Sequence, residues 1–295
     1  MNDQTLSMTA QQPREATGSL RLHITSERQG LPVANAAISI SYTGSPGNIL
    51  ETITTDVNGQ AYLPSLSTPP LEYSLTPDTE QQPYSEYTLQ IQASGYEELT
   101  ISGTQLLAGQ TAQQNISLRT LTPSRSPDTV VIPAHTLYGQ YPPKIAEEEI
   151  KPVTQTGEIV LNRVVLPEYV IVHDGPPQDT SAPNYYVRYR DYIKNVASSE
   201  IYATWPRATI IANILAIQSF TLNRVYTEWY RNKGYSFTIT SSTAFDQKWV
   251  RGRNYYDSIS GAVDEVFDSY LSRPNVRQPI LTQYCDGQRV SCPNW

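Results

Sequence analysis

The chain has 295 residues and a formal net charge of -7, from 21 Lys and Arg against 28 Asp and Glu. This length predicts two domains. Hydrophobic residues make up 39% of the chain, which excludes a charge-rich disordered protein. The acidic balance argues against binding to nucleic acid through a basic surface. No stretch approaches the roughly 20 consecutive apolar residues of a membrane span.

The first segment, residues 1–17, is polar and is expected to be a flexible N-terminus. It lacks the apolar core of a secretory signal. Three alternatives stay open: the protein is not exported, it is exported by another route, or its signal has been removed.

Residues 18–118 alternate apolar and polar residues in several short stretches, which predicts strands with one buried face. Asn58-Gly59 is a hairpin signal between two such stretches. Prolines separate others, so we expect a small β-sandwich. The predicted inward-facing residues are Leu20, Leu22, Ile24, Ile38, Ile40, Tyr87, Leu89 and Ile91.

This segment resembles the carboxypeptidase-regulatory-like, or transthyretin-like, domains. The resemblance rests on "GLPVANAAISI", "TTDVNGQAYLPSL" and "YTLQIQASGYEEL". It implies an accessory module without a site of its own.

Residues 119–163 are rich in proline and show no sustained periodicity, so we expect an extended linker and a site of proteolysis. From residue 164 the pattern changes. "VVLPEYVIVHDG" predicts a strand, and "NYYVRYRDYIKNVASSEIY" predicts a helix after a tyrosine-rich lead. A long, largely buried helix is predicted from Pro206, with Thr204 as its cap, to Gly234.

Three scattered histidines give no local support for a Ser–His–Asp site, and there is no H-E-x-x-H motif or phosphate-binding glycine loop. Any chemistry must therefore rest on carboxylates. Glu200 lies in "NVASSEIYATWP", where Tyr202 and Trp205 can desolvate it. Desolvation raises a carboxyl pKa and suits a general acid that acts on a glycosidic oxygen. The alternative is a Glu that braces the following helix.

The stretch "DYIKNVASSEIYATWPRATIIANILAIQSFTLNRVYTEW" is similar to the core motif of the stage II sporulation protein D/LytB family. That family includes peptidoglycan lytic transglycosylases whose catalytic acid is the Glu of a Ser-Glu pair. The resemblance implies that this acid is Glu200. "AFDQKWVRG" matches a second family region loosely, through Asp246, Gln247 and Trp249.

From about Gly139 onwards the chain resembles SleC-type spore-cortex-lytic enzymes more closely, through "YPPKI", "YVIVHDG", "SSEIYATWP", "SFTLNRVYTEWYRNKGY", "FTITSSTAFDQ" and "TQYCDG". This resemblance implies cleavage of the MurNAc–GlcNAc β-1,4 bond to 1,6-anhydro-MurNAc during spore germination. It implies location in the spore cortex or cell wall, glycan strands as partners and an activating protease. It implies no cofactor.

We therefore expect a two-domain protein: an N-terminal all-β sandwich of transthyretin-like type and a C-terminal α+β domain, residues 164–295, of lytic-transglycosylase type. Relative to SleC-type enzymes, that second domain ends early. The expected substrate contacts are Tyr202, Trp205, Asn213, Gln218, Ser219, Asp246, Gln247, Trp249 and Tyr284.

Two departures from the family patterns bear on the site. Asn213 and Gln218 stand where the family has Gln and Arg, and five residues at roughly 100° each place them on different sides of a helix. The residues themselves leave a disulfide, metal ligands and free thiols open for Cys285 and Cys292. Some family members bind zinc near these cysteines, but no His lies near them here, which favours a disulfide or free thiols and no metal.

Two other functions stay open. One is a non-catalytic peptidoglycan-binding or structural protein of a spore or phage particle, which the substituted helix residues favour. The other is a hydrolytic muramidase that uses a second carboxylate such as Asp246.

Overall fold

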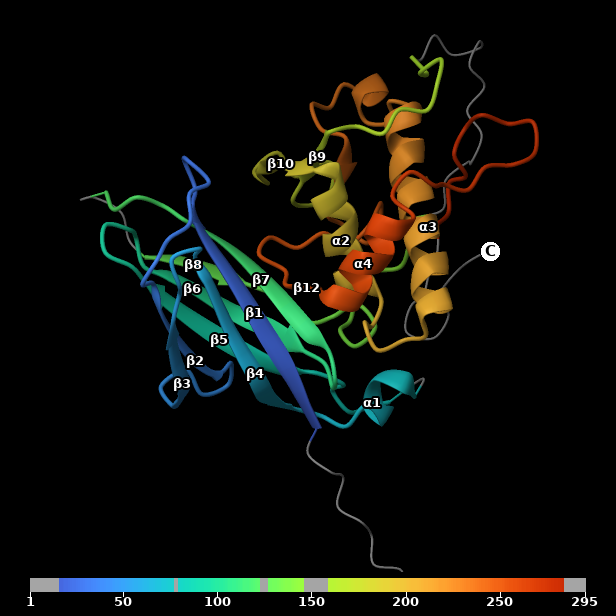
Figure 1. Ribbon diagram of the computed structural model, residues 1–295. Coiled ribbons are helices and arrows are strands. Elements are labelled where there is room, and N and C mark those ends of the chain that lie inside the picture. The colour runs from blue at the N-terminus through green and yellow to red at the C-terminus, as the bar shows by residue number, and fades with distance from the viewer. Residues whose placement is uncertain (1–15, 77–78, 123–126, 146–158, 284–295) are drawn as a thin grey trace, which may run out of the picture.

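The computed structural model describes residues 16–76, 79–122, 127–145 and 159–283 (Figure 1). In the first part of the chain, two sheets pack face to face as a β-sandwich. Its elements are β1 Ala16–Ser26, β2 Ala37–Tyr42, β3 Ile49–Thr54, β4 Gln60–Thr68, the short helix α1 Glu72–Leu75, β5 Ser85–Gln92, β6 Leu99–Leu106, β7 Thr111–Leu118 and β8 Asp128–Val131.

The alternation in the sequence correctly predicted the core of this sandwich. One sheet has the strand order β12-β7-β1-β4 and the other β3-β2-β5-β6-β8. Leu20 and Leu22 of β1 and Ile38 of β2 are fully buried, because successive side chains of a strand point to opposite faces and these point between the sheets. The other five predicted inward-facing residues are buried as well.

The Asn58-Gly59 signal forms a tight turn but not the predicted hairpin. Gly59 has a φ of 70°, and Asp56 Oδ1 accepts hydrogen bonds from the backbone N–H groups of Asn58 and Gln60, each 2.8 Å long. The strand before the turn, β3, pairs with β2, whereas the strand after it, β4, pairs with β1 in the other sheet. The turn therefore carries the chain from one sheet to the other.

Two segments from outside residues 18–118 complete the sandwich. β8 pairs in parallel with β6, although it lies in the stretch predicted to be a linker. β12, Tyr255–Tyr256, pairs antiparallel with β7 and comes from the second half of the chain. Strands this short carry too little alternation to be recognised in a sequence.

Residues 159–283, called here the C-terminal region, lie beside the sandwich (Figure 1). Three helices in it pack on one another, and a small sheet has the order β10-β9-β11. Its elements are β9 Tyr169–His173, β10 Asn184–Arg188, α2 Tyr189–Glu200, α3 Arg207–Tyr226, the 3-10 helix η1 Arg231–Lys233, β11 Ile239–Thr240, β12 and α4 Asp257–Glu265.

The long helix is shorter than predicted. Its α-helical part ends at Tyr226, and Glu228 then adopts a φ of 47°. This left-handed backbone cannot continue a right-handed helix. Gly234, the predicted end, instead follows the separate 3-10 helix with a φ of 84°. Thr204 does not cap α3, since its hydroxyl donates to Ser74 Oγ of the sandwich at 2.8 Å.

Buried polar contacts join the two parts. The guanidinium of Arg253 donates to Gln105 Oε1 at 2.6 Å and to Ser199 Oγ at 3.1 Å. Asn254 exchanges two hydrogen bonds with the backbone of Gln105, at 3.0 and 2.8 Å. Gln105 belongs to β6 and Ser199 to α2, so the sandwich is linked to the last turn of α2.

The predicted fold class is wrong. The described residues form three β-sheets, and their helices are few: three short ones and the 20-residue α3. They contain no helix-rich domain of the lytic-transglycosylase type. Instead, a strand of the C-terminal region is hydrogen-bonded into the sandwich, and one hydrophobic core includes residues from both parts. None of the described helices is long and apolar enough to cross a bilayer.

Candidate functional site

Glu200 is the last residue of α2, and its side chain is half-buried. The helix ends there because Ile201 is extended, with φ -133° and ψ 149°. Oε1 of Glu200 accepts a 2.6 Å hydrogen bond from the backbone N–H of Lys248. The negative end of the helix dipole disfavours charge on this carboxyl group, whereas the N–H stabilises the charged form.

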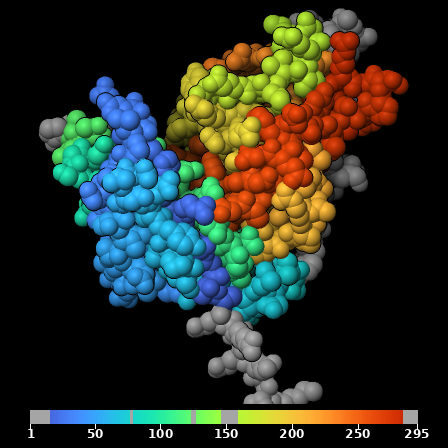
Figure 2. Space-filling model, viewed as in Figure 1, coloured from blue at the N-terminus to red at the C-terminus, as the bar shows by residue number. Residues whose placement is uncertain are grey.

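A pocket of about 300 Å³ lies between the sandwich and the C-terminal region. Glu200 does not line it, but its carboxyl group is hydrogen-bonded to Lys248, which does. Residues 129–131 of β8 and Pro133 line one side. Asp174, Tyr185 and residues 248–251 line the rest, so Lys248 both contacts Glu200 and borders the pocket. Figure 2 shows the two parts of the molecule in contact, with the surface hollowed where they meet.

Aromatic and polar groups meet in this pocket. The rings of Tyr185 and Trp249 lie 5.3 Å apart between their centroids, with an angle of 37° between their planes. Trp249 is buried, so its ring is largely committed to packing. Asp174 Oδ1 accepts a 2.8 Å hydrogen bond from the Ser241 hydroxyl. The pocket thus offers an aromatic wall and a carboxylate, which are groups that sugar-binding sites use.

Lys248, which lines the same pocket, carries a cation. Its ammonium lies 5.3 Å from the centre of the Tyr141 ring. Burial lowers the pKa of Lys248, and the nearby carboxylate of Asp174 partly opposes this effect. Among the described residues, no carboxylate forms an ion pair with this ammonium.

Four of the predicted substrate contacts lie in the core instead. The side chains of Gln218, Ser219, Asp246 and Gln247 are buried and hydrogen-bonded inside the C-terminal region. Gln218 Nε2 donates to the carbonyl of Val266 at 2.8 Å, and Ser219 Oγ accepts from the backbone N–H of Leu271 at 2.7 Å. A side chain without exposed surface does not touch a glycan, so these four residues stabilise the fold.

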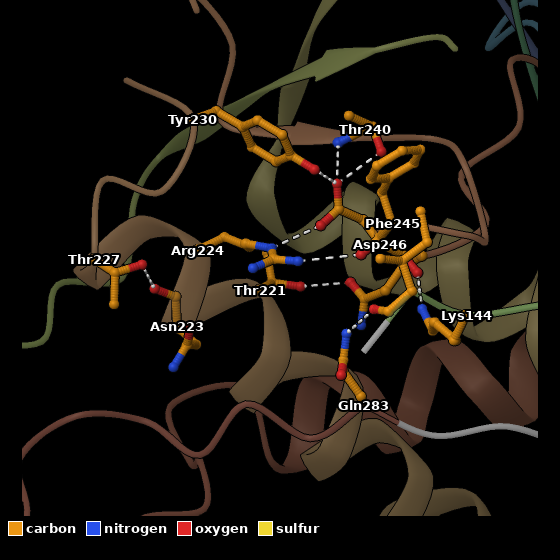
Figure 3. Close-up of polar contacts among 12 residues, drawn as sticks. Lys144, Thr221, Asn223, Arg224, Thr227, Tyr230, Thr240, Phe245, Asp246 and Gln283 are labelled. Carbon is orange, nitrogen blue, oxygen red and sulfur yellow. Dashed lines mark hydrogen bonds and ion pairs between the residues drawn. The ribbon is translucent and has the colours of Figure 1, made fainter. Parts of the chain in front are cut away.

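Asp246 is the centre of this buried network (Figure 3). Its carboxylate accepts hydrogen bonds from Arg224 Nε at 2.6 Å, from the Tyr230 hydroxyl at 2.6 Å, and from the backbone N–H and hydroxyl of Thr240 at 2.8 and 2.7 Å. The side chains of Arg224 and Asp246 are both 0% exposed. Asp246 is therefore a structural ion-pair partner and does not reach a substrate.

Gln247, next to Asp246, belongs to an adjoining set of buried hydrogen bonds. Its Oε1 accepts from the hydroxyls of Thr221 and Tyr192, at 2.8 and 3.2 Å. Its Nε2 donates to the carbonyl of Ile217 at 3.0 Å. These bonds join the segment that follows β11 to α2 and α3.

The remaining predicted contacts are scattered. Tyr202 is buried, with its ring 4.5 Å from that of His135. Trp205 donates its indole N–H to the carbonyl of Ser74 in the sandwich at 3.0 Å. Asn213 donates to the carbonyl of Thr209 within α3 at 2.8 Å. Tyr284, Cys285 and Cys292 lie outside the described residues.

Of the predicted site residues, Trp249 lines the pocket, and Glu200 is hydrogen-bonded to Lys248, which lines it as well. Lys248 and Tyr185 were not predicted as contacts. Lys248 stands inside the quoted block "AFDQKWVRG", and Tyr185 inside the tyrosine-rich lead to α2. Nothing in the local sequence marks Lys248 or Tyr185 as a pocket residue. The pocket forms only because β8, which is distant in the chain, packs against them.

Comparison with known proteins gives little to set beside this geometry. No family model matches the chain, and no curated protein matches it.

Solved structures match parts of the chain. The TIE protein of Bacillus anthracis is 18% identical over 36% of this chain and 17% of its own, with a TM-score of 0.25. The 5-hydroxyisourate hydrolase of Klebsiella pneumoniae is 16% identical over 35% of this chain and 92% of its own, with a TM-score of 0.23. The minor pilin GBS52 of Streptococcus agalactiae is 15% identical over 39% and 49%, with a TM-score of 0.26. With TM-scores this low, the likenesses carry no argument about function.

Proposed function

We propose that this protein is a peptidoglycan lytic transglycosylase that cleaves the MurNAc–GlcNAc β-1,4 bond of the spore cortex during germination, with Glu200 as its general acid and base. One observation carries the proposal: the carboxyl group of Glu200 accepts a hydrogen bond from Lys248, which lines a pocket with an aromatic wall. The sequence blocks shared with SleC-type enzymes support it, and they are the basis for the cortex as its location and for activation by a protease.

The reaction needs one proton donor and no positioned water. Glu200 protonates the glycosidic O4 of the leaving GlcNAc as the bond from C1 of MurNAc to O4 breaks. The C6 hydroxyl of the same MurNAc then attacks C1, and the carboxylate of Glu200 takes the hydroxyl proton. The new C1–O6 bond closes the 1,6-anhydro ring, and Glu200 returns to its protonated form.

The test is digestion of purified spore-cortex peptidoglycan, followed by mass spectrometry of the released fragments. The protein should release anhydro-muramyl products, and Glu200→Gln should reduce this activity about 10²- to 10⁴-fold at an unchanged melting temperature. Glu265→Gln is a matched control, since Glu265 is an exposed carboxylate at the end of α4. An active Glu200→Gln variant would refute the acid assignment.

The same digestion separates the alternatives. Asp174 is a carboxylate that lines the pocket, and together with Glu200 it makes hydrolysis the second candidate function. Fragments with an ordinary reducing end, in an activity that Asp174→Asn abolishes, would identify a muramidase. Sedimentation of the folded protein with cortex sacculi, without soluble fragments, would identify a non-catalytic binder.

A further inference from the structure

Lys248 is an unusual cation in this molecule. It is half-buried, it lines the pocket, and its ammonium faces the ring of Tyr141 at 5.3 Å. Within the described part of the chain, no acidic side chain lies within ion-pair distance of it. Burial removes part of the water around this cation, and the carboxylates of Asp174 and Glu200 act on it only from beyond ion-pair distance. A ligand carboxylate in direct contact would relieve the remaining penalty.

The other charged side chains that line the pocket already have partners, so Lys248 is the candidate for binding a ligand carboxylate. Arg251 lines the pocket too, but its guanidinium is bound to Asp128 at 2.9 Å. Asp174 is engaged by the hydroxyl of Ser241. Arg253, buried behind the pocket, adds positive charge that acts on Lys248. When Glu200 is protonated, as the general acid must be, one negative charge near Lys248 is lost. The net charge around Lys248 is then more positive, which favours binding of an anion.

The place of Lys248 relative to Glu200 defines which sugar would carry that anion. Its backbone N–H binds the carboxyl group of Glu200, and the residue also lines the pocket. A ligand carboxylate at the ammonium is therefore close to the scissile bond. GlcNAc has no acidic group, whereas a muramyl unit carries a lactyl carboxylate or the carboxylates of a stem peptide attached to it.

We propose that Lys248 binds a carboxylate of the muramyl unit and thereby sets which of the two alternating glycosidic bonds lies at Glu200. This inference rests on the proposed function. A carboxylate held by Lys248 also disfavours negative charge on Glu200 nearby, so an acidic substrate helps to keep the general acid protonated. A neutral glycan lacks both effects.

The test is direct binding, measured by NMR titration of the full chain. The probes are N-acetylmuramic acid, muramyl dipeptide and the neutral tri-N-acetylchitotriose. We expect Lys248→Met to weaken binding of an acidic probe about 10- to 100-fold, the range of a charge-assisted hydrogen bond, and to leave the neutral probe unchanged. Lys248→Arg should retain most of the affinity. Lys233→Met, which removes an exposed lysine of η1, is the control.

Each outcome has a defined meaning. A loss seen only with N-acetylmuramic acid identifies the lactyl carboxylate as the ligand group, and a loss seen only with muramyl dipeptide identifies the peptide carboxylate. Equal binding of acidic probes to the wild type and Lys248→Met, or an equal loss of the neutral probe, would overturn the inference.

Binding does not require turnover, so the two proposals fail separately. If cleavage depends on Glu200 but acidic probes bind Lys248→Met as well as the wild type, only this inference is refuted. If binding of acidic probes depends on Lys248 but no glycan is cleaved, only the proposed transglycosylase function is refuted.

Discussion

The sandwich and the C-terminal region share one hydrophobic core but differ in a buried charge. The core of the sandwich includes the aliphatic residues Leu20, Ile38 and Leu89. The C-terminal region buries an ion pair between Arg224 and Asp246. Hydrophobic burial is tolerant and additive, whereas a buried polar network depends on every partner being present. The two parts should therefore respond differently to substitution.

The largest effect is expected at Asp246. Asp246→Ala leaves Arg224 charged and buried without its carboxylate, which should lower the free energy of unfolding by about 3–5 kcal/mol. Urea denaturation measures this loss. The double variant Arg224→Met with Asp246→Ala removes both charges and should be more stable than Asp246→Ala alone. A loss below about 1 kcal/mol for Asp246→Ala would contradict the structural role assigned to this pair.

The sandwich offers the matching test of an apolar core. Ile38→Ala should reduce the free energy of unfolding by about 3 kcal/mol, through lost burial and the cavity left behind. Ile49→Ala on the edge strand β3 is the control, because Ile49 is 57% exposed and its loss should change stability by less than about 0.5 kcal/mol. Equal effects at the two positions would show that the alternation does not define the core.

A smaller effect is expected where the two parts meet. Arg253→Met removes charge-assisted hydrogen bonds to Gln105 and Ser199, which should lower the free energy of unfolding by about 1.5–3 kcal/mol. Since Ser199 precedes Glu200, we also expect the variant to lose glycan-cleaving activity at temperatures where it is still folded. Arg190→Met, which breaks an exposed pair with Asp264, is the control for both measurements. Full stability in Arg253→Met would disprove this coupling.

The smallest effect concerns pH. Burial holds the pKa of His135 well below its ordinary value, and Arg253 adds to this shift. The unfolded chain therefore takes up a proton below about pH 6.5 that the folded protein does not. This contribution to stability is full above that pH and is lost as pH falls towards the lowered folded pKa. By about pH 5.5 the loss should reach about 1.4 kcal/mol.

Thermal or urea unfolding of His135→Gln at both ends of this pH range isolates the effect, since the variant should lack it. The parallel variant His23→Gln, at an exposed position of β1, should behave as the wild type does. An unchanged pH dependence in His135→Gln would show that other groups cause the acid sensitivity.

These contrasts also explain which parts of the molecule were predictable. The strand faces of β1, β2 and β5 were predicted correctly, because period-2 alternation reports directly on burial. The helix α2 was predicted as well, and the end of α3 was predicted eight residues too late. Of the predicted site residues, Trp249 lines the pocket, and Glu200 contacts the pocket residue Lys248. Lys248 gave no signal, since a single lysine in a loop is the most ordinary of surface residues.

What the sequence determined by itself is local: which stretches alternate, where the long helix begins, and that Glu200 precedes this largely buried helix. The tertiary structure alone decided that β8 and β12 join the sandwich, that Asp246 and Gln247 turn inward, and that Lys248 meets Glu200. The reason is physical. Alternation and helix propensity act over a few residues, whereas a pocket or an ion pair forms between segments whose separation in the chain carries no trace of their contact.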